Sequence, residues 1–202
     1  MKLLPTASQT VGPYMHIGMA WLTIDRVAAP GCAGQHLTVG GRVLDGDGQP
    51  VPDALVEIWQ ADAHGRYAHA EDTREAPLTP GFRGFGRVPT DADGRYRFFT
   101  IKPGSYPWQN HPNAWRPAHI HYSLFGPSFC TRLVTQMYFP GDPLLARDPM
   151  YLSVPAEEAR RRLIAAFDWV TTVPEEALGY RFDIVLRGRE ATPREDPPGG
   201  RP

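Results

Sequence analysis

Short runs of alternating apolar and polar residues, separated by turns rich in glycine and proline, most limit how this chain can fold. The alternation is clear in HLTVGGRVLD from residue 36, and it resumes after a DGDG turn in ALVEIWQAD from residue 54. With 20 glycines and 22 prolines, turn residues recur between these short runs rather than between long helical segments. The pattern is typical of an all-β sandwich or barrel and not of a parallel α/β sheet.

Further strands and one helix complete the expected architecture. In the run from residue 54, Leu55, Glu57 and Trp59 share one face of the predicted strand. A helix is predicted in PAEEARRRLIAAFDW, residues 155–169, which has apolar residues at helical spacing and two glutamates near its start. Four more runs are expected to be strands: residues 95–104, 119–126, 132–142 and 180–188.

The chain is expected to have three parts. These are an extended N-terminal arm over residues 1–36, a β-sandwich domain with long loops and one or two short helices over 37–188, and a tail over 189–202. The tail is charged, rich in proline and glycine and poor in apolar residues, so we expect it to be poorly ordered.

Charge and cysteine content exclude several classes of function. The 21 basic and 22 acidic side chains nearly cancel, so no global field favours nucleic acid or an anionic membrane surface. Cys32 and Cys130 lie far apart and predict neither a disulfide framework nor a thiolate zinc site. No stretch has the length of a secretory signal core or a membrane span, so we expect a soluble, cytoplasmic protein.

An unusual concentration of reactive side chains occurs at residues 106–121, which read YPWQNHPNAWRPAHIH. Because His119 and His121 are two residues apart, a strand would point both imidazoles to one face. Such a pair is either half of a metal site or an ordinary pair of surface or core histidines. The stretch has no carboxylate but begins with Tyr106, and a phenolate ligand beside histidines favours Fe(III) over zinc or Fe(II).

At this point the sequence resembles a known family. The stretch YPWQNHPNAWRPAHIHYSLFGP, with GRY upstream and TQMYFPGDPL downstream, is similar to the intradiol ring-cleaving dioxygenases, most closely those that act on protocatechuate. The resemblance covers roughly residues 37–187. It implies one non-haem Fe(III) per active site, with Tyr106 and His121 as axial ligands and Tyr67 and His119 as equatorial ligands.

The resemblance also implies roles around the metal. Arg116 would stabilise negative charge as the substrate ketonises, Gln136 would lie beside the iron, and Trp59 and Trp108 would line the substrate pocket. Physical chemistry agrees with the first role, because a permanently cationic arginine opposes charge that grows on the substrate ring. A tyrosinate such as Tyr106 can also leave the metal and take up a proton, so it can serve as both ligand and base.

The expected substrate is a small aromatic diol that reacts with O2 to give a cis,cis-muconate-type product. Protocatechuate (3,4-dihydroxybenzoate) is the leading candidate substrate, but Gln109 stands where the resemblance predicts an arginine near the substrate carboxylate. Tyr14, His111 or Arg74 could take the place of that arginine in binding the carboxylate. Met150 resembles an apolar wall of the pocket. Catechol, hydroxyquinol and other substituted catechols therefore stay open as alternatives.

The N-terminal sequence SQTVGPYMHIGMA resembles the arm of the subunit that usually lacks iron in this family. The arm either packs on the sheet as a structural element or lines an active site, its own or a neighbour's, with Thr10, Gly12, Pro13 and Tyr14. A homo-oligomer is therefore expected, with a hetero-oligomer containing a related subunit as the alternative. The arm also leaves open a non-catalytic partner subunit, whereas a zinc hydrolase would lack a third ordinary ligand.

Overall fold

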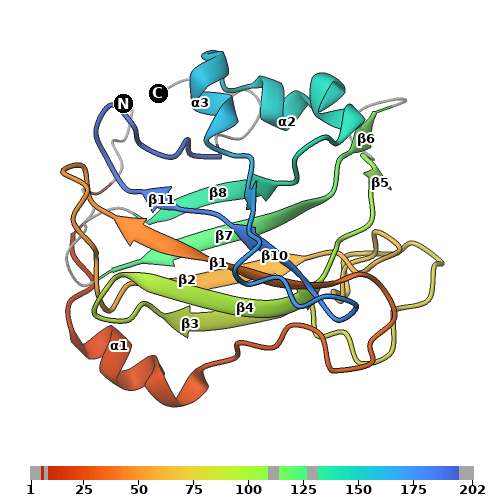
Figure 1. Ribbon diagram of the computed structural model, residues 1–202, viewed down its shortest axis with the longest axis horizontal. Helices are drawn as coiled ribbons and strands as arrows, with labels where there is room; N and C mark the ends of the chain where they lie inside the picture. Colours follow the sequence, from red (N-terminus) through yellow and green to blue (C-terminus); the bar gives the residue numbers. More distant parts are fainter. Residues whose placement is uncertain (1–5, 7–8, 109–113, 127–131, 196–202) are drawn as a thin grey trace.

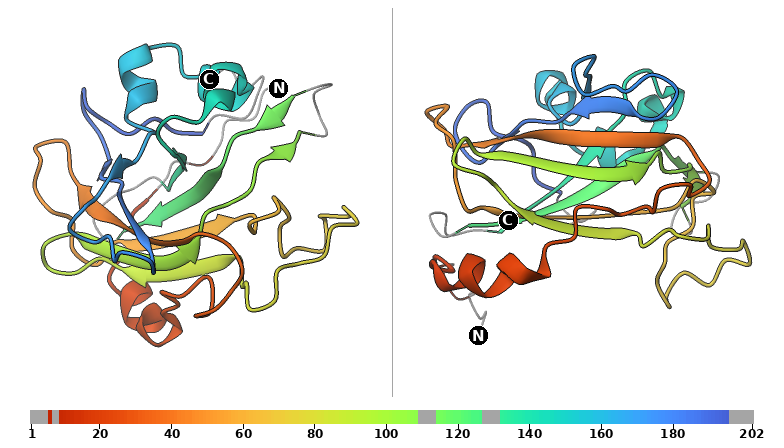
Figure 2. Two further views of the ribbon diagram at one scale, coloured as in Figure 1. Left: turned by 45° about the vertical axis from the view of Figure 1, so that its right-hand side comes forward. Right: turned by 60° about the horizontal axis from the view of Figure 1, so that its bottom comes forward.

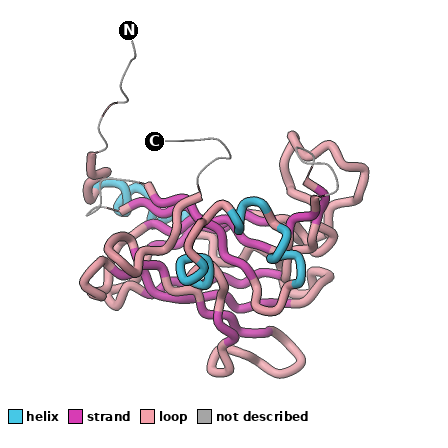
Figure 3. The backbone as a smooth tube through the Cα atoms, turned by 90° about the horizontal axis from the view of Figure 1, so that it is seen from above, coloured by secondary structure: helices cyan, strands magenta, loops and turns pink. Residues whose placement is uncertain are grey.

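Two β-sheets packed face to face form the body of the molecule in the computed structural model, which describes residues 6, 9–108, 114–126 and 132–195. Figure 2 shows the two sheets as layers, and Figure 3 shows the few helices outside them. The predicted all-β sandwich is confirmed. No helix in these described ranges is long and apolar enough to cross a membrane.

The first sheet is built around β1, which pairs with β4 on one side and with β10 and then β11 on the other. The β1–β4 pairing is antiparallel, whereas β10 and β11 run parallel to β1, and β9 adds to β10. The strands are β1 (His36–Leu44), β4 (Arg95–Ile101), β9 (Ala166–Phe167), β10 (Leu178–Arg181) and β11 (Ile184–Val185).

The second sheet is antiparallel throughout, in the order β3-β2-β7-β8, so that β8 is an edge strand. Its strands are β2 (Leu55–Gln60), β3 (Phe85–Pro89), β7 (His119–Phe125) and β8 (Leu133–Tyr138). A separate two-stranded ribbon, β5 (Tyr106–Pro107) with β6 (Trp115–Arg116), lies at one end of the sandwich (Figure 1).

The core lies between the sheets and follows the period of two. In β2, Val56 and Ile58 are fully buried while Glu57 and Trp59 are half-buried, as the alternation in the sequence predicts. Removing one such aliphatic side chain from water contributes about 1.5–3 kcal/mol, so the alternation fixes which face of each strand turns inward. Fully buried partners from other strands are Val39, Phe98, Ile120, Tyr122, Leu124, Met137 and Ile184.

The predicted strands form where expected, except that the last run is split into β10 and β11. At the split, Phe182 N donates to Gly40 O, and a Cβ on Gly41 would lie 2.0 Å from Phe182 O. The backbones therefore approach more closely there than a regular ladder allows.

The helix predicted over residues 155–169 is wrong beyond its first turns, because α3 spans only Glu157–Arg161. The chain then turns to the sheets: Tyr138 N donates to Leu163 O, Ala165 N donates to Tyr138 O, and Ala166–Phe167 form β9. Residues 163–167 therefore form backbone hydrogen bonds with both sheets instead of helical ones. Their apolar pattern is compatible with either a helix or a strand. Two short helices precede it, η2 (Pro143–Arg147) and α2 (Pro149–Leu152).

Both flanks of the sandwich are more structured than expected. The arm contains α1 (Tyr14–Met19) and η1 (Ala20–Leu22), so it is not extended throughout. The expected poor order of the tail does not hold for residues 189–195, which run from β11 to the free edge of β8; the rest of the tail lies outside the described residues. Unpaired strand edges can hold a polar segment through backbone hydrogen bonds, which composition does not reveal.

Candidate metal centre

The two histidines of β7 point to the same side of the second sheet, as their spacing predicts. Their Nε2 atoms lie 3.2 Å apart, and His119 is almost fully buried. His119 Nδ1 lies 2.7 Å from Pro117 O, and only a protonated nitrogen bonds to a carbonyl oxygen. The lone pair of His119 Nε2 is therefore directed at the space between the two rings.

Two tyrosine hydroxyls complete a cluster of four donor atoms. Tyr67 Oη lies 3.2 Å from Tyr106 Oη, 3.1 Å from His121 Nε2 and 3.4 Å from His119 Nε2. Tyr106 Oη lies 3.2 Å from His119 Nε2. Separations of 3.1–3.4 Å suit ligands of a single ion, because nitrogen and oxygen ligands each about 2.0 Å from a metal lie roughly 3 Å from one another. The donor set fits a metal ion.

The tyrosines are needed for that fit. No group of three or more His, Cys, Asp or Glu side chains placed to hold a metal occurs in the part of the chain that the structure describes. Two phenolates and two neutral imidazoles form an oxygen- and nitrogen-donor set with two negative charges. Such a set suits a trivalent cation better than a soft or divalent one.

A close backbone contact brings the two tyrosine-bearing loops together. Gly104 N donates to Asp62 O at 2.8 Å, and Gly65 N donates to the same oxygen at 3.0 Å. A Cβ on Gly104 would lie 2.4 Å from Ala63 O, and one on Gly65 would lie 2.5 Å from Ser105 O. Because neither position has room for a side chain, the glycines of GRY and PGSY set the distance between Tyr67 and Tyr106.

Burial keeps the cluster neutral in the absence of a cation. Burial raises the pKa of the Tyr67 hydroxyl well above its usual range, with a further contribution from Tyr106, and burial also raises the pKa of Tyr106. Burial and the charge of Arg116 hold the pKa of His119 well below its usual range. Ionisation of the phenols therefore depends on a bound cation, and metal binding would release protons.

A buried network holds Arg116 beside the cluster, where β5–β6 pairing sets it opposite Tyr106. Its Nε lies 2.9 Å from Asp148 Oδ1, off the line of the N–H bond, as an ion pair. One terminal nitrogen donates to Gln136 Oε1. The Tyr138 hydroxyl lies 2.9 Å from that oxygen and 3.0 Å from Asp148 Oδ2, so it can donate to either. The guanidinium is thereby fixed in place.

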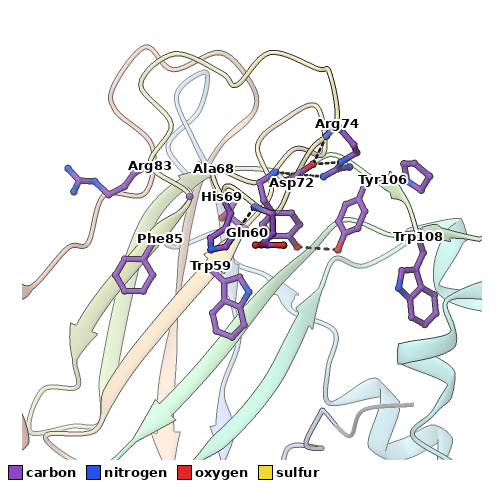
Figure 4. Close-up of a pocket in the computed structure, with 14 residues that line it drawn as sticks. Trp59, Gln60, Ala68, His69, Asp72, Arg74, Arg83, Phe85, Tyr106 and Trp108 are labelled. Carbon is purple, nitrogen blue, oxygen red and sulfur yellow. Dashed lines mark hydrogen bonds and ion pairs between the residues drawn. The ribbon is translucent and has the colours of Figure 1, made fainter. Parts of the chain in front are cut away.

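A cleft of about 580 Å³ opens beside the cluster. Tyr67 and Tyr106 form part of its wall, and Trp59 and Trp108 lie on either side of Tyr106 in Figure 4. The indole of Trp59 stacks on the His121 imidazole, with centroids 4.8 Å apart and planes 2° from parallel. The cleft is large enough for one aromatic ring and has flat apolar walls to receive it.

Comparison with known proteins identifies the family. The family model Dioxygenase_C, described as "Dioxygenase", matches residues 19–188. The chain is 65% identical over 162 residues to the protocatechuate 3,4-dioxygenase beta chain of Burkholderia cepacia, covering 80% of this chain and 68% of that one. This chain belongs to the intradiol ring-cleaving dioxygenases.

Two further relatives agree with this assignment. This intradiol dioxygenase is 35% identical over 208 residues to the protocatechuate 3,4-dioxygenase alpha chain of Pseudomonas putida, covering 95% and 96% of the two chains. It matches the solved dioxygenase domain from Streptomyces sp. SirexAA-E with a TM-score of 0.59 and 28% identity, over 91% of this chain and 98% of that one. The family and the enzyme class predicted from the sequence are confirmed.

The dioxygenase structure brings together most of the residues that the sequence singled out. The four expected metal ligands form the cluster, Arg116 and Gln136 are bonded to each other beside it, and Trp59 and Trp108 line the cleft. Gln109 and His111 lie outside the described residues. Arg74 does lie at the cleft, with its guanidinium 4.9 Å from the Tyr106 ring centroid and paired with Asp72.

Two expectations about the substrate pocket are not met within one chain. Met150 lies on α2 and lines a small separate cavity with Gln136 and Tyr138, not the cleft beside the tyrosines. α1 lies away from β5 and β6 (Figures 1 and 2), and Tyr14 at its start is 84% exposed. None of Thr10, Gly12, Pro13 and Tyr14 lines the cleft of the same chain, and their placement at a neighbour's site stays a prediction.

Sequence reasoning missed three residues of the intradiol dioxygenase site. Asp148 and Tyr138 hold Arg116, and Glu195 Oε2 lies 3.5 Å from His121 Nδ1. Burial raises the pKa of the Glu195 carboxyl, but interactions with His121 and Gln136 outweigh burial and lower it overall. No local pattern marks any of the three, because each acts on a residue that is distant in sequence or on another strand.

The glycine contact gives a direct test of how the tyrosines are placed. Gly104→Ala is expected to cost about 1–3 kcal/mol of stability, because its Cβ must push away the loop that carries Tyr67. It should also weaken metal binding, measured by competition with a chelator alongside thermal unfolding. Gly18→Ala is the control, because a Cβ there meets nothing within 4 Å. Unchanged metal binding in Gly104→Ala would contradict the role of the contact.

Proposed function

We propose that this chain is a non-haem Fe(III) intradiol dioxygenase that cleaves a catechol between its two hydroxyl-bearing carbons and inserts both atoms of O2. The product is a cis,cis-muconate-type diacid. The observation that carries the proposal is the cluster of Tyr67, Tyr106, His119 and His121, whose donor atoms lie 3.1–3.4 Å apart in five of their six pairs. All four residues would hold the metal, and Tyr106 with His121 is the one pair of the four without such a close contact in the described structure.

Each residue around the proposed iron has a separate role in ring cleavage. Bound Fe(III) would supply the Lewis acidity that holds the catechol as its dianion and activates its ring. Tyr106 lines the cleft and can accept a proton from a substrate hydroxyl, so that the charge of the site changes little. Arg116 opposes negative charge that develops on the ring, and Gln136 holds that guanidinium in place. Trp59 and Trp108 pack against the ring and exclude water.

Protocatechuate is the proposed substrate. Two relatives carry that substrate in their names, and one of them shares 65% of its residues with this chain over 162 positions. Arg74 places a cation at the cleft, where it can contribute to recognition of a ring carboxylate although Asp72 shares its charge. Catechol and hydroxyquinol are the alternatives for the same site.

Assembly with further chains is also proposed. Two of the relatives are named as alpha and beta chains, and the arm exposes large apolar side chains, among them Tyr14, Ile17 and Trp21. Such side chains are suited to cover a neighbouring molecule. A homo-oligomer is the leading form, with a related second subunit as the alternative, and the cytoplasm is the proposed location.

The test is an aerobic substrate panel with the iron-loaded protein, following oxygen uptake and product spectra. Purified protein is expected to be red-brown, because tyrosinate-to-Fe(III) charge transfer absorbs visible light. Protocatechuate should be consumed fastest, with one O2 per ring. A colourless protein that cannot be reconstituted with iron would rule out the function, whereas faster turnover of catechol or hydroxyquinol would change only the substrate.

A further inference from the structure

The segment 189–195, called here the C-terminal segment, connects the two sheets next to the metal centre. Thr192 is buried, its N–H donates to Val185 O at 2.9 Å, and its hydroxyl accepts from Val185 N at 3.0 Å. The segment then follows the free edge of β8, where Glu195 N donates to Val134 O at 2.8 Å. These backbone bonds fix where the Glu195 side chain lies.

Two buried donors next to this side chain make no hydrogen bond in the described structure, namely His121 Nδ1 and Gln136 Nε2. They come from directly paired positions of β7 and β8. Gln136 cannot reverse its amide without loss, because Arg116 donates to its Oε1 and a reversed amide would turn an N–H group toward that guanidinium. Its Nε2 therefore points away from Arg116. Buried donors of this kind are rarely left without an acceptor.

The Glu195 carboxylate is the acceptor that faces both donors. Its Oε2 lies 3.5 Å from His121 Nδ1, slightly farther than in a hydrogen bond, and the carboxylate interacts with Gln136 as well. The other histidine differs, because His119 Nδ1 already donates to the Pro117 carbonyl. Among the described residues, His121 Nδ1 meets Glu195 instead of a backbone oxygen.

We propose that Glu195 is a positioning residue for the metal ligand His121. Its carboxylate accepts a hydrogen bond from the Nδ1–H group, which keeps the proton on Nδ1 and leaves Nε2 free to bind the metal. The same contact holds the ring in the plane that stacks on Trp59 and makes the imidazole a stronger donor. Through Gln136 the same carboxylate connects to Arg116. The inference rests on the proposed function, because it assigns His121 to a metal, and it makes the C-terminal segment part of the metal centre.

The test compares Glu195→Ala and Glu195→Gln with wild type and with Glu190→Gln. Glu190 lies in the same segment, pairs with Arg162 and is exposed, so it is a matched control. Fe(III) affinity is measured by chelator competition, with the tyrosinate-to-Fe(III) band as a second readout and thermal unfolding as the check on folding. Glu195→Ala is expected to lose about 10–100-fold in Fe(III) affinity and to shift the band, Glu195→Gln to lose less, and Glu190→Gln to match wild type.

The outcomes separate the inference from the function on which it rests. Wild-type affinity and an unshifted band in both Glu195 variants would overturn the role of Glu195 alone, and so would an equal loss in Glu190→Gln. A wild-type protein that binds no Fe(III) would overturn both proposals. If Glu195→Ala does not fold, Glu195→Gln decides, because it keeps the size of the side chain and removes only its charge.

Discussion

Tyr106→Phe is expected to lower kcat for ring cleavage by about 10²–10⁴-fold, the range for loss of a positioned base. The hydroxyl removed contacts both Tyr67 Oη and His119 Nε2, so the substitution takes away one donor of the metal centre and the proton acceptor at the cleft together. The visible absorption should weaken and shift, because one of two tyrosinates no longer contributes. Steady-state oxygen uptake and the absorption spectrum of the iron-loaded variant measure these effects.

Tyr180→Phe is the matched control for that experiment. Tyr180 is buried on β10, where its ring packs against Phe139 and Phe167 away from the metal centre. Loss of its hydroxyl should leave the spectrum and the rate unchanged. If Tyr106→Phe also keeps the wild-type spectrum and rate, Tyr106 is neither a ligand nor a base.

Arg116→Met is expected to have two separable effects. Removing the guanidinium leaves Asp148 as an uncompensated buried charge, which should cost about 3–5 kcal/mol of stability. Removing the cation from beside the metal centre should also lower kcat by about 10²–10³-fold, as for other groups that stabilise developing charge. Denaturant unfolding and oxygen uptake measure the two effects independently.

The double variant Arg116→Met with Asp148→Asn separates stability from catalysis. Asparagine removes the stranded charge and can still cap α2, where the Asp148 side chain accepts from Tyr151 N. Much of the lost stability should return while kcat stays low. Recovery of kcat together with stability would mean that Arg116 acts only on the fold and not on developing charge.

The part of the site that local spacing could predict is the part that lies on one strand. His119 and His121 share a face because a strand has a period of two, and that rule needs no knowledge of the rest of the fold. Tyr67 could be placed only through the resemblance to a family, since its approach to Tyr106 depends on two glycines that bring distant loops into contact. Asp148, Tyr138 and Glu195 stand at no characteristic spacing, so the sequence did not indicate that they belong to the site.

The failures of prediction have a common physical cause. Residues 162–169 carry apolar spacing that suits a helix, yet β8 and β10 offered backbone partners that a helix at this position could not use. The C-terminal segment was expected to lack order because it has few apolar residues, but the edge of β8 holds its backbone. In both cases the structure of the segment depends on hydrogen bonds to a strand elsewhere in the chain. A local stretch of sequence does not include that strand, so it cannot predict the pairing.

The pairing of β1 has a consequence for how the protein is made in the cell. Its antiparallel neighbour β4 follows within the same half of the chain, but the register pairs Leu37 with Leu178, close to the other end of the sheet-forming sequence. During synthesis one edge of β1 therefore stays open until β10 and β11 leave the ribosome, and an open edge can pair with other nascent chains. The histidines and tyrosines emerge well before that edge is closed. Rapid completion of the chain shortens the time for which this edge is exposed, so conditions that slow the synthesis of the last strands should increase the share of protein lost to aggregates.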